Sequence, residues 1–313
     1  MSKVKTALIG FGHLGRFHAQ KIAACENADF VAIVEPTAAG RERAHSEHPS
    51  VEIVESLEKL SKQASAAIVA TPTSYHFDIC KKLIERDMHV FCEKPVTDKL
   101  EDSLKLQELV KTKKIVFQVG HSERCHEAWE RRSEFLEFLT PGCHLTLDRY
   151  APFKGRATDV DVVNDLMIHD LDLLRFLLGK DPVSVSAHGF KQRTKHWDHA
   201  VAHLDWSDGT RATITVGRGE VNEVRSLKSA SSAGVWRVDL MKNEIQTAYA
   251  DASEVKIEGY NKRDHLLLEQ EAFYNSILSG KPPMVSLEDG IAAVKLIDAV
   301  LQSLESHKTV QLQ

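Results

Sequence analysis

The sequence has no long apolar run, and this absence sets a first limit on what the chain does. No stretch reaches about 18 consecutive apolar residues, the length that a transmembrane helix needs. The first residues, Met1 to Lys5, lead directly into a strand-like segment and include no apolar signal segment. We therefore expect a cytoplasmic protein with no membrane partner.

Cysteine is scarce, and charge of one sign is not in excess. The five cysteines form no CxxC pair, and an odd, dispersed set is typical of free thiols in a reducing compartment. The formal net charge is −5, and Lys and Arg are scattered among Asp and Glu, so we expect no nucleic-acid partner. Internal repeats and low-complexity linkers are also lacking. The 313 residues exceed one ordinary core, which favours two domains.

The first 120 residues or so alternate strand and helix patterns. Their apolar runs are continuous, which is typical of parallel strands covered on both faces. The pattern predicts a doubly wound parallel sheet of the α/β class. We place its strands at 5–9, 30–34, 51–54, 66–70, 89–92 and 115–119, and helices at 14–24, around 41–44, at 75–86 and at 98–111, with Thr97 as a cap for the last.

The pattern changes after Gly120. A helix at 163–178 is followed by alternating strands, and two helices close the chain, the second starting at Ser286 with Asp289 three residues on. This predicts an α+β domain with a large, mostly antiparallel open sheet. We expect domains at 1–121 and 122–313, with the C-terminal helices packing back toward the first. The strands are placed at 183–190, 199–206, 211–216, 236–240 and 255–257.

The alternation in this second sheet bears on assembly. Thr213 and Thr215 alternate with Ile214 and Val216, and the helices of the domain cannot cover both faces. A large open apolar face is unusual on a monomer. We therefore expect a homodimer or homotetramer formed through that face.

A glycine-rich turn follows the first predicted strand and opens the first predicted helix. A GxGxxG in this context is typical of dinucleotide binding in a Rossmann domain, because glycine permits the tight turn and close approach of a pyrophosphate. The helix N-terminus then offers free N–H groups to the anion. The residues concerned are Gly10, Phe11, Gly12, His13, Leu14 and Gly15.

An acidic residue ends the second predicted strand. Glu35 lies 20 residues after Gly15, where a carboxylate accepts hydrogen bonds from the ribose hydroxyls and repels a 2′-phosphate. NAD is therefore the expected cofactor. Arg41 and Arg43 follow on the next helix, and a nearby arginine can admit NADP, so the preference for NAD is not absolute.

Two further segments place polar groups where a catalytic pocket is expected. Lys94 follows a parallel strand at the carboxyl edge, where open α/β sheets bind ligands. Asp165 and His169 are four residues apart in a predicted helix and share one face, which suits a histidine base oriented by a carboxylate. A surface lysine and a surface Asp–His pair are the alternatives. Asp170 and Asp172 are expected at the helix surface or as caps.

A metal site is not expected. Residues 121–126 hold two histidines, a glutamate and a cysteine, but lie at a strand-to-helix junction. His199 and His203 share a face of a predicted strand, not of the helix that a zinc HxxxH pair requires.

Taken in order, these motifs resemble the Gfo/Idh/MocA oxidoreductases, the family of glucose–fructose oxidoreductase and inositol dehydrogenase, along essentially the whole chain. The resemblance implies that Lys94, Asp165 and His169 are catalytic. It also implies that the nicotinamide half of the cofactor lies along Thr71, Pro72, His76, Glu93 and Lys94. It favours an NAD-linked dehydrogenase acting on a sugar hydroxyl.

A narrower resemblance covers Asp161 to Asp172 with Arg156, and Gly120 to Arg124. It is to a subgroup that oxidises the 3-hydroxyl of UDP-N-acetylglucosamine ahead of amination, for lipid A carrying a diamino sugar. Arg124, Arg156 and Asn164 are the expected substrate-binding residues, since arginine suits a diphosphate. Structural ion pairs are the alternative for both arginines.

The chain departs from that subgroup at one place. Cys125-His126-Glu127 stands where Phe-Asn-Pro is expected, so the exact sugar stays open. The other hypotheses are an inositol or other sugar dehydrogenase of the same family, a reductase of a non-sugar ligand, and a dinucleotide-binding sensor without turnover.

Overall fold

The structure, a computed structural model, describes residues 3–61, 63–155 and 158–312. The chain divides into two compact units. The first comprises the residues up to Ser122 together with Asp264–Val294, and the second comprises Glu123–Arg263 and the residues from Lys295 onward. The first unit ends within a residue or two of the expected boundary, and a C-terminal segment returns to it.

The first unit is built on a six-stranded parallel sheet, as the described residues define it. The strand order is β3-β2-β1-β4-β5-β6, so the direction of winding reverses between β1 and β4. This is the doubly wound order in which ligands bind at the carboxyl ends of β1 and β4. The strands are β1 (Val4–Ile9), β2 (Ala28–Val34), β3 (Glu52–Val54), β4 (Ala66–Val69), β5 (His89–Glu93) and β6 (Phe117–Gly120).

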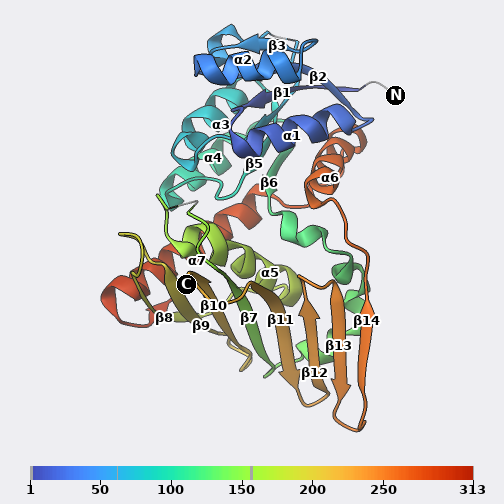
Figure 1. Cartoon of the computed structure of the whole chain (residues 1–313), viewed down its shortest axis with the longest axis vertical. Coiled ribbons are helices and arrows are strands. Elements are labelled where there is room, and N and C mark those ends of the chain that lie inside the picture. Colours follow the sequence, from blue (N-terminus) through green and yellow to red (C-terminus); the bar gives the residue numbers. More distant parts are fainter. Residues whose placement is uncertain (1–2, 62, 156–157, 313) are drawn as a thin grey trace. The chain divides into compact units, whose positions relative to one another are not determined.

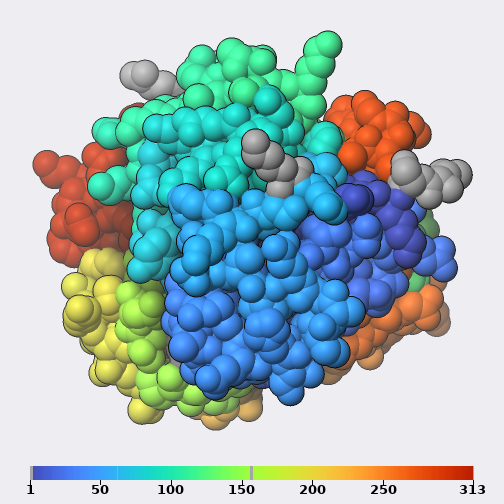
Figure 2. All heavy atoms as spheres, turned by 90° about the horizontal axis from the view of Figure 1, so that it is seen from above, coloured from blue at the N-terminus to red at the C-terminus, as the bar shows by residue number. Residues whose placement is uncertain are grey.

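Helices cover both faces of this sheet and bury the continuous apolar strands (Figure 1). On one face, Phe273 and Tyr274 of the late helix α6 pack with Ile22 of α1 over Leu8 and Phe91. Figure 2 shows the orange-red α6 beside the dark-blue N-terminal segment. The helices are α1 (His13–Ala24), α2 (Ala38–Glu47), α3 (His76–Glu85), α4 (Leu100–Lys111), α6 (His265–Ser279) and the start of α7 (Leu287–Ser306).

Two helix starts test the expected caps. At α7, Asp289 N–H donates to Ser286 Oγ and Ser286 N–H donates to the Asp289 carboxylate, which is the reciprocal box that the spacing predicted. At α4, the prediction was wrong by two residues. Thr97 does not cap a helix at Asp98, because its hydroxyl lies 2.7 Å from the Lys99 carbonyl oxygen and the helix begins at Leu100.

The second unit is built on a nine-stranded sheet in the part of the chain described. The order is β14-β13-β12-β11-β7-β10-β9-β8-β15, with β10 and β7 parallel and the other neighbours antiparallel (Figure 1). The strands are β7 (His144–Ala151), β8 (Ser184–Phe190), β9 (His199–Asp205), β10 (Arg211–Arg218), β11 (Val224–Ser231), β12 (Gly234–Asp239), β13 (Glu244–Tyr249), β14 (Val255–Gly259) and β15 (Val310–Gln311).

The helical parts of this unit are mostly short. A π-helical turn, Val163–Met167, leads into α5 (Ile168–Leu178). Residues 122–139 form three 3₁₀ segments, Ser122–Cys125, Glu127–Glu134 and Leu136–Leu139. No helix among the described residues is long and apolar enough to cross a membrane.

The two faces of the nine-stranded sheet differ sharply. Ile214 and Val216 are fully buried on one face. On the other, the row of paired residues through Thr213 is polar, with His203 and Thr146 beside it. The apolar residues that alternate with the threonines of β10 therefore face the core, and the centre of the open face is polar. Among the described residues, exposed apolar side chains on the open face lie toward its two edges, at Val235, Val255 and Ile257 on one side and at Phe190 on the other.

Candidate active site

The glycine loop between β1 and α1 has the geometry that each glycine position requires. Gly10 has φ +94°, and a Cβ there would lie 2.8 Å from the Ala70 carbonyl oxygen. A Cβ on Gly15 would lie 2.1 Å from the Gly10 carbonyl oxygen, so helix and strand pack too closely for a side chain. At Gly12 a Cβ would meet nothing within 4 Å, which leaves the backbone open to a ligand.

Glu35, one residue after β2, is fixed against this loop. Its Oε2 accepts the Phe11 N–H at 2.9 Å, and its Oε1 accepts the Thr37 N–H and hydroxyl at 2.9 and 2.6 Å. Burial opposes ionisation, but these hydrogen bonds and Arg41 lower the pKa of Glu35 below its ordinary value. The carboxylate is therefore charged at neutral pH. Arg41 itself is anchored, since its Nη1 donates to the Glu35 and Pro36 carbonyl oxygens.

Two residues after β4 have different surroundings. The Thr71 hydroxyl is buried and has no hydrogen-bond partner among the described residues. A bound ligand could provide that partner. His76 is instead held by the chain: its Nδ1 lies 2.8 Å from the Pro95 carbonyl oxygen and its Nε2 lies 2.9 Å from that of Thr71. His76 thus joins the segment after β4, which continues through Pro72, to the segment after β5.

Glu93 and Lys94 follow at the carboxyl end of β5. The Glu93 carboxylate is buried and bonds His18 Nε2 at 2.7 Å and the Lys94 N–H at 3.1 Å. The backbone of Lys94 is therefore fixed by a hydrogen bond to the side chain of the preceding residue, Glu93. The Lys94–Pro95 peptide bond is cis.

The other predicted catalytic residues lie in the second unit. Asp165 belongs to the π-helical turn and His169 to the first turn of α5, so the interval between them is not the regular α-helix that the spacing predicted. Asp161 opens this segment: its carboxylate accepts both the backbone and the side-chain N–H of Asn164. The Asn164 side chain is thereby held at the helix start.

The arginines expected to bind substrate fall into different situations. Arg124 donates twice to the Asp172 carboxylate, at 2.8 and 2.6 Å, and its guanidinium lies over the Phe176 ring. Since the Arg124 side chain is only 6% exposed, it makes the structural ion pair that was the alternative to phosphate binding. Arg156 lies outside the described residues.

The surface placement expected for two α5 carboxylates is wrong. Asp170 and Asp172 are 3% and 1% exposed, and each pairs with an arginine. The partner of Asp170 is Arg149 of β7, a strand that the sequence did not predict. Buried carboxylates are tolerated where arginine compensates their charge.

Comparisons with known proteins assign both parts of the chain. Residues 4–121 match the profile described as "Oxidoreductase family, NAD-binding Rossmann fold", and residues 141–227 match the Gfo/Idh/MocA C-terminal domain. The UDP-N-acetylglucosamine 3-dehydrogenase of Acidithiobacillus ferrooxidans is 34% identical over 96% of each chain. The chain belongs to the Gfo/Idh/MocA family.

Solved structures agree with this assignment. A structure of the Acidithiobacillus enzyme superposes with a TM-score of 0.90 at 30% identity, covering 98% of this chain and 99% of that one. The NAD(+)-dependent scyllo-inositol 2-dehydrogenase of Bacillus subtilis is 27% identical over 99% of this chain and 96% of its own. The scyllo-inositol dehydrogenase of Lactobacillus casei, with NAD(H) and scyllo-inositol bound, shares the fold with a TM-score of 0.85 at 22% identity, over 99% of each chain.

This Gfo/Idh/MocA enzyme is an NAD-dependent dehydrogenase that acts on CH–OH groups. Its first unit fits NAD. The open backbone at Gly12 suits a pyrophosphate, and the charged Glu35 suits a ribose. The buried Thr71 hydroxyl can bond a polar group of the cofactor. NAD supplies the hydride acceptor when it binds.

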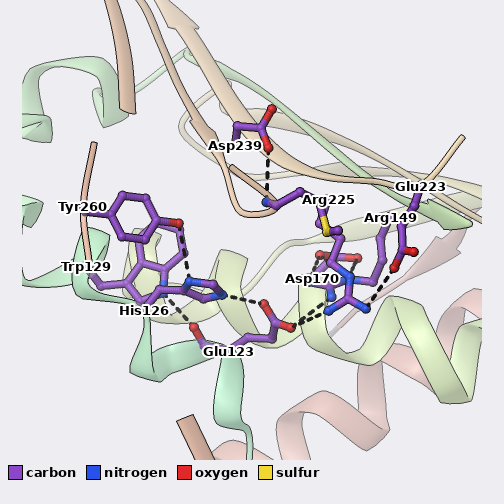
Figure 3. Close-up of polar contacts among 10 residues, drawn as sticks. Glu123, His126, Trp129, Arg149, Asp170, Glu223, Arg225, Asp239 and Tyr260 are labelled. Carbon is purple, nitrogen blue, oxygen red and sulfur yellow. Dashed lines mark hydrogen bonds and ion pairs between the residues drawn. The ribbon is translucent and has the colours of Figure 1, made fainter. Parts of the chain in front are cut away.

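A buried polar network in the second unit could not be predicted from the sequence (Figure 3). Glu123 Oε1 accepts from Arg149 Nη1 at 3.1 Å, and its Oε2 lies 3.2 Å from His126 Nε2. Tyr260 meets the other nitrogen of His126 at 3.4 Å. Burial would raise the pKa of Glu123, but Arg149, the His126 hydrogen bond and the charge of His169 lower it well below its ordinary value. Glu123 is therefore ionised at neutral pH, and His169 is one of the groups that interact with it electrostatically.

A hollow of about 60 Å³ adjoins this network within the second unit. Asp165, Arg149 and Arg225 contribute to its wall. Arg225 is the more loosely held of the two guanidinium groups, since its nearest carboxylate contacts are 3.8 Å to Glu123 and 3.5 Å to Glu223. It is also 39% exposed in its side chain, against 4% for Arg149.

The segments considered for metal binding have other contacts. Glu123 and His126 bond to one another, and Asp198, which directly precedes His199, accepts N–H groups from Gln192, Arg193 and Thr194. The Cys125-His126-Glu127 stretch, where the chain departs from its subgroup, makes contacts within the second unit. Glu127 forms an ion pair with Arg263 at 3.2 Å.

Proposed function

We propose that the enzyme oxidises the 3-hydroxyl of UDP-N-acetylglucosamine to the 3-keto sugar, with NAD as hydride acceptor. The observation that carries this proposal is the similarity to the Acidithiobacillus UDP-N-acetylglucosamine 3-dehydrogenase over nearly the whole of both chains. The inositol dehydrogenases are less similar, at 27% identity or below over chain-length alignments. The keto product would then be aminated by an aminotransferase, in the formation of lipid A carrying a diamino sugar.

The family resemblance gives three side chains catalytic roles in this proposal. His169 takes the hydroxyl proton, Lys94 holds and polarises the same oxygen, and Asp165 orients the histidine. The electrostatic interaction of the Glu123 carboxylate with His169 supports this choice of base, because a buried anion stabilises the imidazolium that forms. Removing an acid–base group typically costs about 10²–10⁴-fold in rate.

We assign recognition of the diphosphate to Arg225. Asn164 is proposed to contact the sugar, and Arg156 stays a substrate-binding residue predicted from the sequence. Arg124 is committed to Asp172, whereas the contacts of Arg225 with its carboxylates are longer than hydrogen bonds. A phosphate can replace them with a bidentate interaction. Lys154, which pairs with Glu223 at 2.7 Å beside the same hollow, is a second cation for this role.

The test is NAD reduction with UDP-N-acetylglucosamine, in the presence of a carbonyl trap or a coupled aminotransferase, because oxidation by NAD is uphill near neutral pH. We expect turnover that Lys94→Ala and His169→Ala each lower by about 10²-fold or more without changing NAD affinity. Arg225→Ala should raise KM for the UDP-sugar by about tenfold or more and leave NAD binding unchanged. Arg211→Ala, on the same sheet with an exposed side chain, is the matched control.

The second candidate function is oxidation of a free polyol such as an inositol, which the similarity to inositol dehydrogenases supports. A free polyol carries no phosphate, so Arg225→Ala would leave its KM unchanged. Turnover of inositol with none of the UDP-sugar in the trapped assay would decide for this second function. Near-native turnover by Lys94→Ala or His169→Ala would overturn the catalytic roles.

A further inference from the structure

Three ionisable side chains meet inside the first unit, beneath the peptide that carries Lys94. They are His18 of α1, Glu93 of β5 and Glu269 of α6. One side-chain nitrogen or oxygen atom from each residue lies within 4.8 Å of those of the other two. His18, Glu93 and Glu269 are 0%, 6% and 0% exposed. Helix α6 is added to the sheet from near the C-terminal end of the chain, so this grouping is not visible in the sequence.

A chain of hydrogen bonds runs through two of these residues to the Lys94 peptide. The Gln270 amide lies 2.8 Å from His18 Nδ1, His18 Nε2 lies 2.7 Å from Glu93 Oε1, and the Lys94 N–H donates to Glu93 Oε2 at 3.1 Å. If Gln270 donates to Nδ1, the Nε2 nitrogen carries the hydrogen and donates it to Glu93. A neutral His18 therefore satisfies both contacts, and it brings no positive charge to the cluster.

Glu269 takes no part in this hydrogen-bonded series. Among the residues that the structure describes, neither of its carboxyl oxygens has a hydrogen-bond partner. The groups that face it are Glu93 from β5 and His18 from α1, while Gln118 of β6 bonds only its backbone carbonyl. Burial and the charge of Glu93 raise the pKa of Glu269 well above its ordinary value of 4.5. Two carboxylates this close and this deeply buried are not both ionised.

We propose that Glu269 is a neutral carboxylic acid in the working enzyme, which leaves Glu93 as the single negative charge of the cluster. Glu93, braced by His18, then acts as a positioning residue that fixes the Lys94 peptide and sets the electrostatic environment of the Lys94 ammonium group. The second part of this inference rests on the proposed function, because it takes Lys94 to be the group that touches substrate.

A divalent cation is the competing explanation for such a group of side chains. It would need the Nε2 lone pair of His18, but that nitrogen lies at direct hydrogen-bonding distance from Glu93. The Gln270 amide would also have to accept from Nδ1 instead of donating to it. The contacts present therefore favour a proton over a metal.

The charge of Glu269 is tested on the whole enzyme without an activity assay. At neutral pH the wild type should show the infrared carbonyl band of a protonated carboxylic acid, and Glu269→Gln should lack it. Glu271→Gln, the same change two residues along α6, should retain the band. A wild-type spectrum without the band, or a stoichiometric divalent metal in the purified protein, would overturn the neutral acid.

The same assignment predicts how stability depends on pH. A carboxyl whose pKa is raised on folding stabilises fully below its unfolded pKa, and this stability is lost as pH rises toward the folded pKa. Glu269→Gln has no such loss, so its stability relative to the wild type should increase as the pH rises above 4.5. A relative stability that falls over this range would show that Glu269 is ionised and paired.

The positioning role is tested by kinetics. Glu93→Gln should lower kcat at saturating NAD by about 10- to 100-fold, because a small displacement of Lys94 suffices for such a loss. Glu93→Asp, which restores the carboxylate that accepts the Lys94 N–H, should recover part of the lost kcat, whereas a merely structural defect would not be relieved by this shorter side chain.

The outcomes separate the two proposals. If Glu93→Gln keeps the wild-type kcat while Lys94→Ala abolishes turnover, the positioning role is wrong and the proposed function stands. If Lys94→Ala retains turnover, the proposed role of Lys94 fails, and the infrared band still decides the state of Glu269.

Discussion

The Glu35 carboxylate is held by the chain in the place where a cofactor ribose is expected. Its contacts with Phe11 and Thr37 keep it charged and close to the glycine loop. A fixed negative charge there disfavours the additional phosphate of NADP. Arg41, the residue that could have favoured NADP, is bonded to backbone carbonyls instead.

We expect Glu35→Gln to narrow the preference for NAD over NADP by about tenfold, which corresponds to ~1.4 kcal/mol. Gln can still accept the Phe11 N–H, so the change removes the charge and keeps this loop contact, while its NH2 group cannot accept from the Thr37 N–H. Titration of both cofactors measures the ratio, and Arg43→Ala, an exposed neighbour, controls for nearby charge changes. Equal affinities in the wild type would contradict the role given to Glu35.

Residues differ in how much of their role the sequence reveals. The glycines at 10 and 15 were predictable, because their constraint comes from the backbone within a few residues. The partner of Arg124 was not, because Asp172 lies far along the chain and comes near only through the fold. The same holds for Glu269, which no motif joins to His18.

Among the elements, the segment before β9 is organised by one carboxylate. Asp198 is fully buried, accepts three successive backbone N–H groups from residues 192–194, and pairs with Arg218 at 3.1 Å. Burial by itself would raise the pKa of Asp198, but these contacts lower it from 3.8 to about 2. Folding therefore gains stability from this group above pH 3.8, and the gain is lost as the pH falls toward 2.

Asp198→Asn should accordingly destabilise the protein at pH 7 by at most about 2 kcal/mol, and the difference from the wild type should shrink in acid. Denaturant unfolding at pH 7 and near pH 3 measures both values. The exposed Asp251→Asn is the control and should be neutral at each pH. A cost that is the same at both pH values would show that the charge is unimportant.

The elements of the first sheet were predictable and several of the second were not. Continuous apolar runs such as Ala66–Val69 identify buried parallel strands on their own. Strand β7 contains Arg149 and β11 contains Arg225 and Lys228, so their patterns are interrupted by charges whose partners the sequence does not reveal. The 3₁₀ segments of 122–139 have no periodicity to detect.

At the scale of the molecule, the open face of the second unit decides how copies of the chain can associate. The centre of this face is polar, and three of its exposed apolar residues, Val235, Val255 and Ile257, lie toward one edge, on β12 and β14. We propose the expected homodimer or homotetramer through this face, with these three side chains as the apolar part of the contact.

The double variant Val255→Asp/Ile257→Asp should dissociate the assembly, because it puts two charges into the apolar contact. Light scattering at micromolar concentration measures the mass, and circular dichroism checks that the sheet is intact. Val221→Asp is the control, since Val221 is 89% exposed in a loop. A monomeric wild type, or a double variant that stays assembled, would contradict this interface.

The first unit is assembled from two stretches of chain, and this has a consequence during synthesis. Phe273 and Tyr274 cover one face of its sheet, and Val285 and Ile291 enter the core on the other. The ribosome adds about 5–20 residues per second, so the residues between Ser122 and Asp264 occupy it for on the order of ten seconds. For that interval the earliest strands made lack part of their cover, and the nascent chain is then most in need of a chaperone.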